Sequence, residues 1–141
     1  MAHFAKISEE NKVLQVVTVD NKKILDANGV EQESLGKTFL EEKFNWPSHL
    51  WIQCSYNTSA NRHKKGGTPI HGNYPNIGWD WDPVNSIFIY DKPFDSWVLN
   101  TSEARWQSPI GDAPELSAEE QETHYYSWDE VNQAWNKELK S

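Results

Sequence analysis

The sequence lacks the features that mark secreted, membrane-spanning and disulfide-bonded proteins. Cys54 is the single cysteine, which excludes an internal disulfide and favours a reducing compartment. No segment approaches the roughly 20 consecutive apolar residues that a membrane-spanning helix needs. The first residues also do not form the apolar stretch of a secretory signal. We therefore expect a protein that carries no signal peptide and does not cross a membrane.

Positive charge is scarce as well. Thirteen Lys and Arg against 21 Asp and Glu give a net charge of −8. This balance disfavours nucleic-acid binding, because phosphate groups require a basic face. The one basic cluster, Arg62-His63-Lys64-Lys65, lies in a glycine-containing loop. We interpret it as a solvated loop, with a polyanion site as the less favoured alternative.

Motifs that carry catalytic or cofactor chemistry are missing. The chain has no phosphate-binding glycine loop, no serine elbow, and no Cys/His pair with the spacing of zinc ligands. Asp80, Asp82 and Asn85 follow the start of a calcium loop, but the glycine and the distal glutamate are absent, so Asp82 is interpreted as a turn residue. Cys54 has no basic neighbour and is predicted to be a buried, unreactive thiol. We expect no catalysis, no cofactor and no metal.

Aromatic residues are abundant where aliphatic ones are few. The chain has eight Trp, five Tyr and five Phe. Such rings bury on the order of 150–250 Å² each in a core and are also favoured at interfaces. Composition alone leaves both uses open. The length of 141 residues predicts a single domain, 1–141.

The first half of the chain predicts strands and one long loop. Residues 3–8 and 13–19 are predicted to form a hairpin, because the second segment is rich in alternating β-branched residues. Residues 50–56 also alternate and predict a strand. Residues 57–76 are polar and rich in Gly and Pro, and we predict a long exposed loop there.

One helix is predicted near residues 31–44. Apolar residues recur there with a period close to 3.6, and Trp46-Pro47 follows the segment. Gly36 lies inside it, although glycine costs about 1 kcal/mol relative to alanine in a helix. Further on, Ser117 and Glu120 match a capping box and predict a short helical turn.

Residues 77–138 contain a motif that occurs three times. It consists of an aromatic residue, any residue, Trp or Leu, Asp or Asn, five residues, and a final aromatic. The copies are Trp79-Asp80-Trp81-Asp82 with Phe88, Trp97-Val98-Leu99-Asn100 with Trp106, and Tyr126-Ser127-Trp128-Asp129 with Trp135.

The motif predicts a β-hairpin. Residues at i and i+2 lie on one face of a strand, Asp or Asn opens a turn, and the final aromatic returns opposite the first pair. We predict three hairpins with turns at 82–87, 100–105 and 129–134, arranged as an antiparallel meander.

The fold class is mainly β, or α+β when the helix is included. A core role for each ring is the simpler interpretation, but Trp97, Trp106, Trp128 and Trp135 are candidate partner-binding residues.

Six segments of the chain are distinctive in wording: Met1-Ala2-His3-Phe4-Ala5, Val13–Asn21, Trp51–Asn57, Ile77–Asp82, Phe94–Asn100 and Tyr126–Glu130. In these segments the chain resembles a group of small virion-associated proteins of marine tailed bacteriophages, cyanophages among them. Most members of this group have no assigned biochemical role. The resemblance covers nearly the whole chain in order, and His63–Asn73 departs from it as an insertion.

The resemblance implies a component of the virion that is assembled in the host cytoplasm. We expect a virion structural protein, most of all a capsid decoration or cement protein that binds the head lattice in multiple copies. Its partners would be capsid or other virion proteins, and neither nucleic acid nor membrane. The alternative is a tail or tail-fibre module that binds host surface glycan through exposed aromatic rings.

Overall fold

The chain divides into two compact units, which we call the N-terminal unit and the C-terminal unit. The computed structural model describes residues 1–141. The N-terminal unit comprises Met1–Asp91 with Thr101–Arg105, and the C-terminal unit comprises Lys92–Asn100 with Trp106–Ser141. The single domain expected from the chain length stays a prediction. Small antiparallel sheets and one main helix confirm the predicted mainly β, α+β class.

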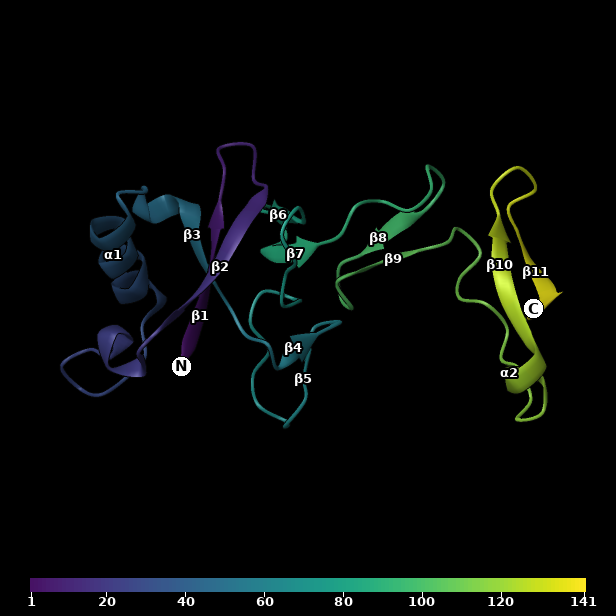
Figure 1. The fold of residues 1–141 in the computed structure, drawn as a ribbon, viewed down its shortest axis with the longest axis horizontal. Coiled ribbons are helices and arrows are strands. Elements are labelled where there is room, and N and C mark those ends of the chain that lie inside the picture. Colours follow the sequence, from purple (N-terminus) through teal and green to yellow (C-terminus); the bar gives the residue numbers. More distant parts are fainter. The chain divides into compact units, whose positions relative to one another are not determined.

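The elements are labelled in Figure 1. The longer ones are strands β1 (Ala2–Ile7) and β2 (Val13–Val19), helix α1 (Glu33–Phe44), and strands β3 (Trp51–Cys54), β10 (His124–Asp129) and β11 (Ala134–Leu139). The shorter ones are the 3-10 turns η1 (Asn21–Ile24) and η2 (Ser48–Leu50), strands β4 (Thr58–Ser59), β5 (Arg62–His63), β6 (Asp80–Asp82), β7 (Ile87–Ile89), β8 (Val98–Asn100) and β9 (Arg105–Gln107), and helix α2 (Glu120–Thr123). None of the helices has the length and apolar character needed to cross a bilayer.

A three-stranded antiparallel sheet of order β2-β1-β3 forms the centre of the N-terminal unit. Strand β1 pairs with β2 from Ala2↔Val19 to Ile7↔Val13, so the predicted first hairpin is confirmed. The same strand pairs with β3 from His3↔Cys54 to Lys6↔Trp51. The strand predicted at 50–56 is therefore present in a shorter form.

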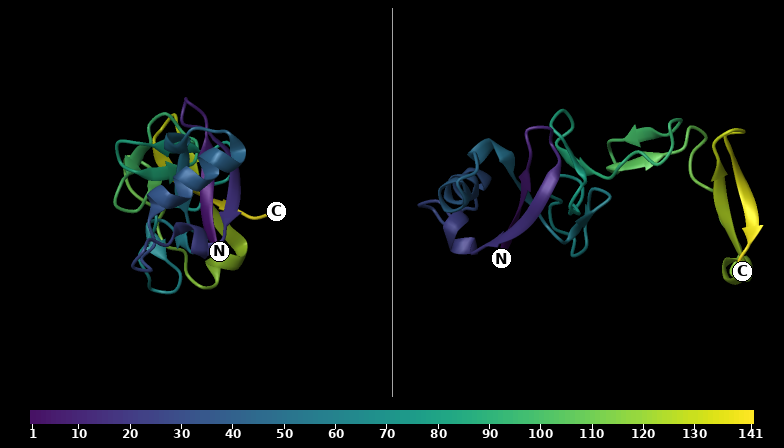
Figure 2. Two further views of the ribbon diagram at one scale, coloured as in Figure 1. Left: turned by 90° about the vertical axis from the view of Figure 1, so that its left-hand side faces the viewer. Right: turned by 45° about the horizontal axis from the view of Figure 1, so that its top comes forward.

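Both faces of this sheet are covered, as Figures 1 and 2 show. Helix α1 lies on one side, where Phe4 and Trp51 pack with Leu40 of the helix. The β6–β7 hairpin lies on the other side, where Ala5 and Phe88 belong to a second apolar cluster. Alternate residues of β1 thus enter two different cores, as the period of two in a strand requires.

Helix α1 confirms the helix predicted near 31–44, with a later start. It ends at Phe44, and the capping residue Asn45 that follows has a left-handed φ of 52°. Gly36 is required by packing, because a Cβ atom built on it would lie 2.2 Å from Cζ of Phe4. The aromatic ring therefore occupies the space that a larger residue would fill, which explains the glycine inside the helix.

All three hairpins of the repeated motif are confirmed: β6 pairs with β7, β8 with β9 and β10 with β11. They are three separate two-stranded sheets, so the predicted arrangement in one meander is wrong. In the first, Asp82 Oδ1 accepts from the main-chain N–H groups of Val84 and Asn85. In the third, Asp129 Oδ1 accepts from Asn132 N–H in the same way. The last residue of each turn is left-handed and not glycine, with φ of 55° at Ser86, 48° at Ala104 and 48° at Gln133. The motif therefore specifies one turn geometry three times.

The segment 57–76 contains more structure than the long exposed loop that the sequence suggests. Strands β4 and β5 form a small ladder within it. Asn73 is buried, and its Nδ2 donates to the carbonyl oxygens of Phe88 at 2.9 Å and Ala104 at 2.8 Å. Thr58 is also buried. The polar character of this segment thus partly reflects side chains that hold neighbouring loops through buried hydrogen bonds.

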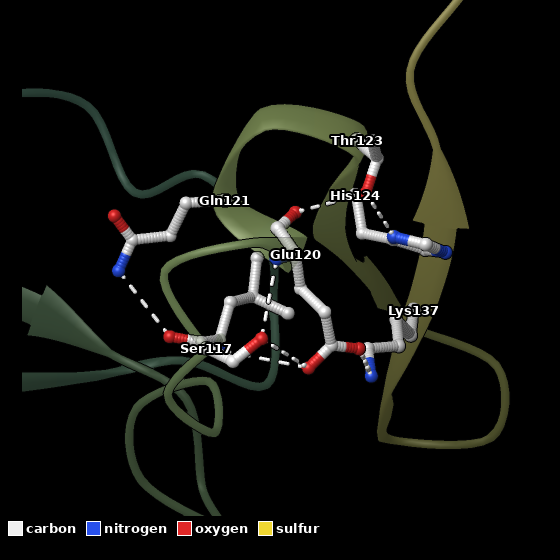
Figure 3. A network of polar contacts seen from close by, with 7 residues as sticks. Ser117, Glu120, Gln121, Thr123, His124 and Lys137 are labelled. Carbon is white, nitrogen blue, oxygen red and sulfur yellow. Dashed lines mark hydrogen bonds and ion pairs between the residues drawn. The ribbon is translucent and has the colours of Figure 1, made fainter.

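The capping box predicted at Ser117 is present (Figure 3). Ser117 Oγ accepts from the main-chain N–H of Glu120 at 3.2 Å, and the Glu120 carboxylate faces the Ser117 hydroxyl and N–H. Glu120 also forms an ion pair with Lys137 of β11. The short helix α2 is therefore tied to strand β11.

Candidate partner-binding surface

Three tryptophans of the C-terminal unit form one group, which we call the tryptophan cluster: Trp97, Trp128 and Trp135. Trp128 and Trp135 are direct partners across the β10–β11 ladder, with ring centroids 5.1 Å apart. Trp97 lies 5.9 Å from each of them. All three pairs are edge-to-face, the geometry that the ring quadrupoles favour. Phe94 extends the group at 5.5 Å from Trp97.

Polar contacts fix two of these rings in place. Trp128 Nε1 donates to Glu130 Oε1 at 2.8 Å, and Trp135 Nε1 donates to the Gly111 carbonyl at 3.0 Å. The Glu130 carboxylate also accepts from the hydroxyl and the main-chain N–H of Ser96. The Ser96 hydroxyl bond, then the Trp128 bond, hold the pKa of Glu130 below its usual value. Glu130 is therefore a charged support for the cluster at neutral pH.

Trp97 differs from the other two rings because its Nε1 is buried without a hydrogen-bond partner. A buried unsatisfied donor costs about 1–3 kcal/mol. Two edge-to-face ring contacts and the contact with Phe94 offset this cost. The central ring is thus held by ring packing alone.

The tryptophan cluster is not a closed core. All three of its rings are half-buried, and Ser108 is the one residue of the C-terminal unit that is buried. The N-terminal unit contrasts with this, since Trp51 is 0% and Trp81 is 9% exposed. The C-terminal unit therefore keeps aromatic surface in contact with solvent.

The sequence-predicted site residues are thus brought together in part. Trp97, Trp128 and Trp135 meet in the cluster. Trp106 of β9 is half-buried and has the Lys92 ammonium 5.7 Å from its ring centroid. The cluster offers the solvent-exposed parts of its half-buried rings to a partner.

A polar pocket of about 310 Å³ in the N-terminal unit was not found by sequence reasoning. Its lining includes His3, Cys54, Tyr56 and His63. Burial lowers the pKa of His3 and raises that of the Cys54 thiol to about 12, so the thiol stays protonated. Cys54 is buried, as predicted. No short motif signals this pocket, because its walls come from segments that are distant in the sequence.

A contact between Glu33 and His71 was also missed. His71 Nε2 lies 3.0 Å from Glu33 Oε1, and its Nδ1 lies 3.2 Å from the Ser86 carbonyl oxygen. Glu33 additionally accepts from Gln53 N–H at 3.4 Å. This contact joins helix α1, strand β3 and segment 57–76.

Comparison with known proteins gives no relative. No protein-family model, no curated protein and no solved structure matches this chain. The structure also holds no group of three His, Cys, Asp or Glu side chains arranged to bind a metal ion.

Proposed function

We propose that this protein is a non-enzymatic structural component of a bacteriophage virion that binds another virion protein through the tryptophan cluster. The favoured role is a capsid decoration or cement protein on the head lattice. One observation supports the binding role most strongly. The tryptophans of the C-terminal unit are only half-buried, and no apolar residue of this unit is buried. The phage context rests on the sequence resemblance.

Docking would supply the burial that the C-terminal unit lacks. Half-buried Trp rings gain most from association, because Trp is enriched among the residues that dominate binding energy. Each copy then needs only modest affinity if neighbouring copies are also in contact. This is the situation of a protein repeated on a capsid lattice.

The cluster suits a protein partner better than a glycan. Sugar stacking needs a free ring face, and each edge-to-face contact among Trp97, Trp128 and Trp135 uses part of a ring face. The glycan-binding tail module is therefore the weaker proposal.

Particle incorporation tests this function. Trp135→Ala should reduce binding to particles that lack the protein by about 30-fold, which corresponds to the 2 kcal/mol typical of an interface aromatic. The matched control is Trp79→Ala, which removes a half-buried ring from the N-terminal unit and should leave binding unchanged. Bound copies per particle are measured by quantitative mass spectrometry, and folding is checked by circular dichroism.

Host adsorption of the same particles separates the two phage roles. Particles that carry Trp135→Ala at normal copy number but fail to adsorb to host cells would contradict the decoration role. They would support the glycan-binding tail module instead.

A further inference from the structure

The N-terminal unit carries three exposed cations close together, Arg62, Lys64 and Lys65, which we call the basic turn. None of them forms an ion pair within the chain. They stay unpaired although acidic residues are in excess in this chain, whose net charge is −8. The basic turn therefore presents its charge outward.

The basic turn has a defined backbone. Lys64 N–H donates to the Asn57 carbonyl at 2.8 Å, and Gly66 N–H donates to the His63 carbonyl at 3.1 Å. Lys65 N–H donates to His63 Nδ1 at 3.0 Å. The β4–β5 ladder supports the start of the turn. These hydrogen bonds hold the main chain that carries the three cations.

The complementary charge lies in the C-terminal unit. That unit has nine acidic residues and three lysines, which gives a net charge of −6, whereas twelve acidic and ten basic residues give −2 in the N-terminal unit. Residues 106–136 contain seven acidic residues and neither Lys nor Arg. Most of the negative charge of the protein is thus concentrated in one part of the chain.

Within this stretch we call residues 112–122 the acidic segment. Glu115, Glu119 and Glu122 are exposed, and their carboxylates form no ion pair. Glu120 differs, because it is paired with Lys137 (Figure 3). The three unpaired carboxylates of the acidic segment thus equal the three unpaired cations of the basic turn in number and are opposite in charge.

We propose that the basic turn of one copy docks on the acidic segment of a second copy. Each copy has one patch of each kind, so the contact is head-to-tail and can extend from copy to copy. Opposite potentials steer such an encounter, and salt weakens it because exposed charges are screened beyond about 10 Å at 0.1 M salt. The inference goes beyond the proposed particle binding, to which it would add contacts between neighbouring copies.

Sedimentation velocity of purified protein tests the proposal. The wild type should form oligomers that grow with protein concentration at 50 mM NaCl, and its dissociation constant should rise at least about tenfold at 500 mM NaCl. The variants Arg62→Glu/Lys64→Glu/Lys65→Glu and Glu115→Lys/Glu119→Lys/Glu122→Lys should each be monomeric at low salt. Their equimolar mixture should associate again, since each variant keeps one intact patch and the two reversed patches are also opposite in charge.

A matched charge reversal serves as the control. Lys22→Glu/Lys23→Glu alters two exposed lysines of η1 and should leave association intact. Near-UV circular dichroism checks folding, and Lys64→Ala/Lys65→Ala replaces the triple variant if that variant unfolds.

The proposal is overturned by a wild type that stays monomeric at low salt, by a mixture that stays monomeric, or by either charge-reversed variant associating on its own. No particle is present in this experiment. Its outcome is therefore independent of whether the protein binds a capsid.

Discussion

Trp81 of the N-terminal unit and Trp128 of the C-terminal unit occupy the same position in the repeated hairpin motif. Each lies opposite an aromatic partner across its ladder, Phe88 at 4.9 Å and Trp135 at 5.1 Å. Each is followed by an Asp that accepts the same turn hydrogen bonds. Yet Trp81 is buried in a core cluster, whereas Trp128 is half-buried.

The difference shows that the motif determines the hairpin and its surroundings determine burial. Trp81 is covered by the central sheet and by His71, whose ring lies 4.9 Å away. The ring contacts of Trp128 are with Trp97 and Trp135, which are themselves half-buried. One local design therefore provides a core ring in one unit and a surface ring in the other.

The largest expected effect is the loss of stability when a buried core ring is removed. Trp51→Ala should destabilise the protein by about 3–5 kcal/mol, the usual loss for a buried large aromatic, because Trp51 is 0% exposed. Trp128→Ala should cost less than about 2 kcal/mol, since its ring already contacts solvent. Urea denaturation followed by far-UV circular dichroism measures both. Equal losses would contradict the distinction between the units.

A second effect concerns the close approach of α1 to the sheet. Gly36→Ala should destabilise by about 1–3 kcal/mol through overpacking against Phe4, despite the better helix propensity of alanine. Ser34→Ala on the exposed side of the same helix is the control and should be neutral or slightly stabilising. Thermal unfolding compares the two variants, and a stabilised Gly36→Ala would show that the Phe4 ring has room to move.

A third effect is acid sensitivity of the N-terminal unit. Burial alone would raise the pKa of Glu33, but the hydrogen bond and charge of His71, the Gln53 N–H and Lys37 outweigh it and lower the pKa from 4.5. A depressed carboxyl pKa adds stability that is present above the unfolded value and is lost as pH falls through the folded value. Glu33→Gln should therefore flatten the loss of stability between about pH 5 and pH 3. Urea midpoints across this range measure it, and an unchanged pH profile would argue against the contact.

The sequence predicts the local parts of this fold because their signals are local. Asp82 and Asp129 with their following turns predict hairpins, and the Ser117–Glu120 spacing predicts a cap. The buried role of Asn73 and the Glu33–His71 contact depend on partners far away in the chain, which no short pattern encodes. The sequence predicts the three members of the tryptophan cluster as candidates. That they are half-buried could be seen only in the folded structure, because burial depends on the surroundings of each ring.

The smallest expected effect concerns the left-handed turn residues, Ser86 in the N-terminal unit and Gln133 in the C-terminal unit. Ser86→Gly and Gln133→Gly should each stabilise the protein by roughly 0.5 kcal/mol, because glycine adopts positive φ more easily than other residues, at some cost in chain entropy. Both residues are exposed and have similar φ. Chemical denaturation of the two variants should therefore give equal shifts. A shift in one unit alone would show that the turns are not equivalent.

Hydrogen exchange of the protein with and without partner particles tests the central claim most directly, namely that the C-terminal unit is a binding surface without a core of its own. For the free protein, we predict strong protection in β1 and β3 and weak protection in β10 and β11, because little apolar surface is buried around the latter. Addition of particles should slow exchange in 94–99 and 126–136 and leave β1 unchanged. Strong protection of β10 and β11 in the free protein, with no change on particle addition, would contradict the account.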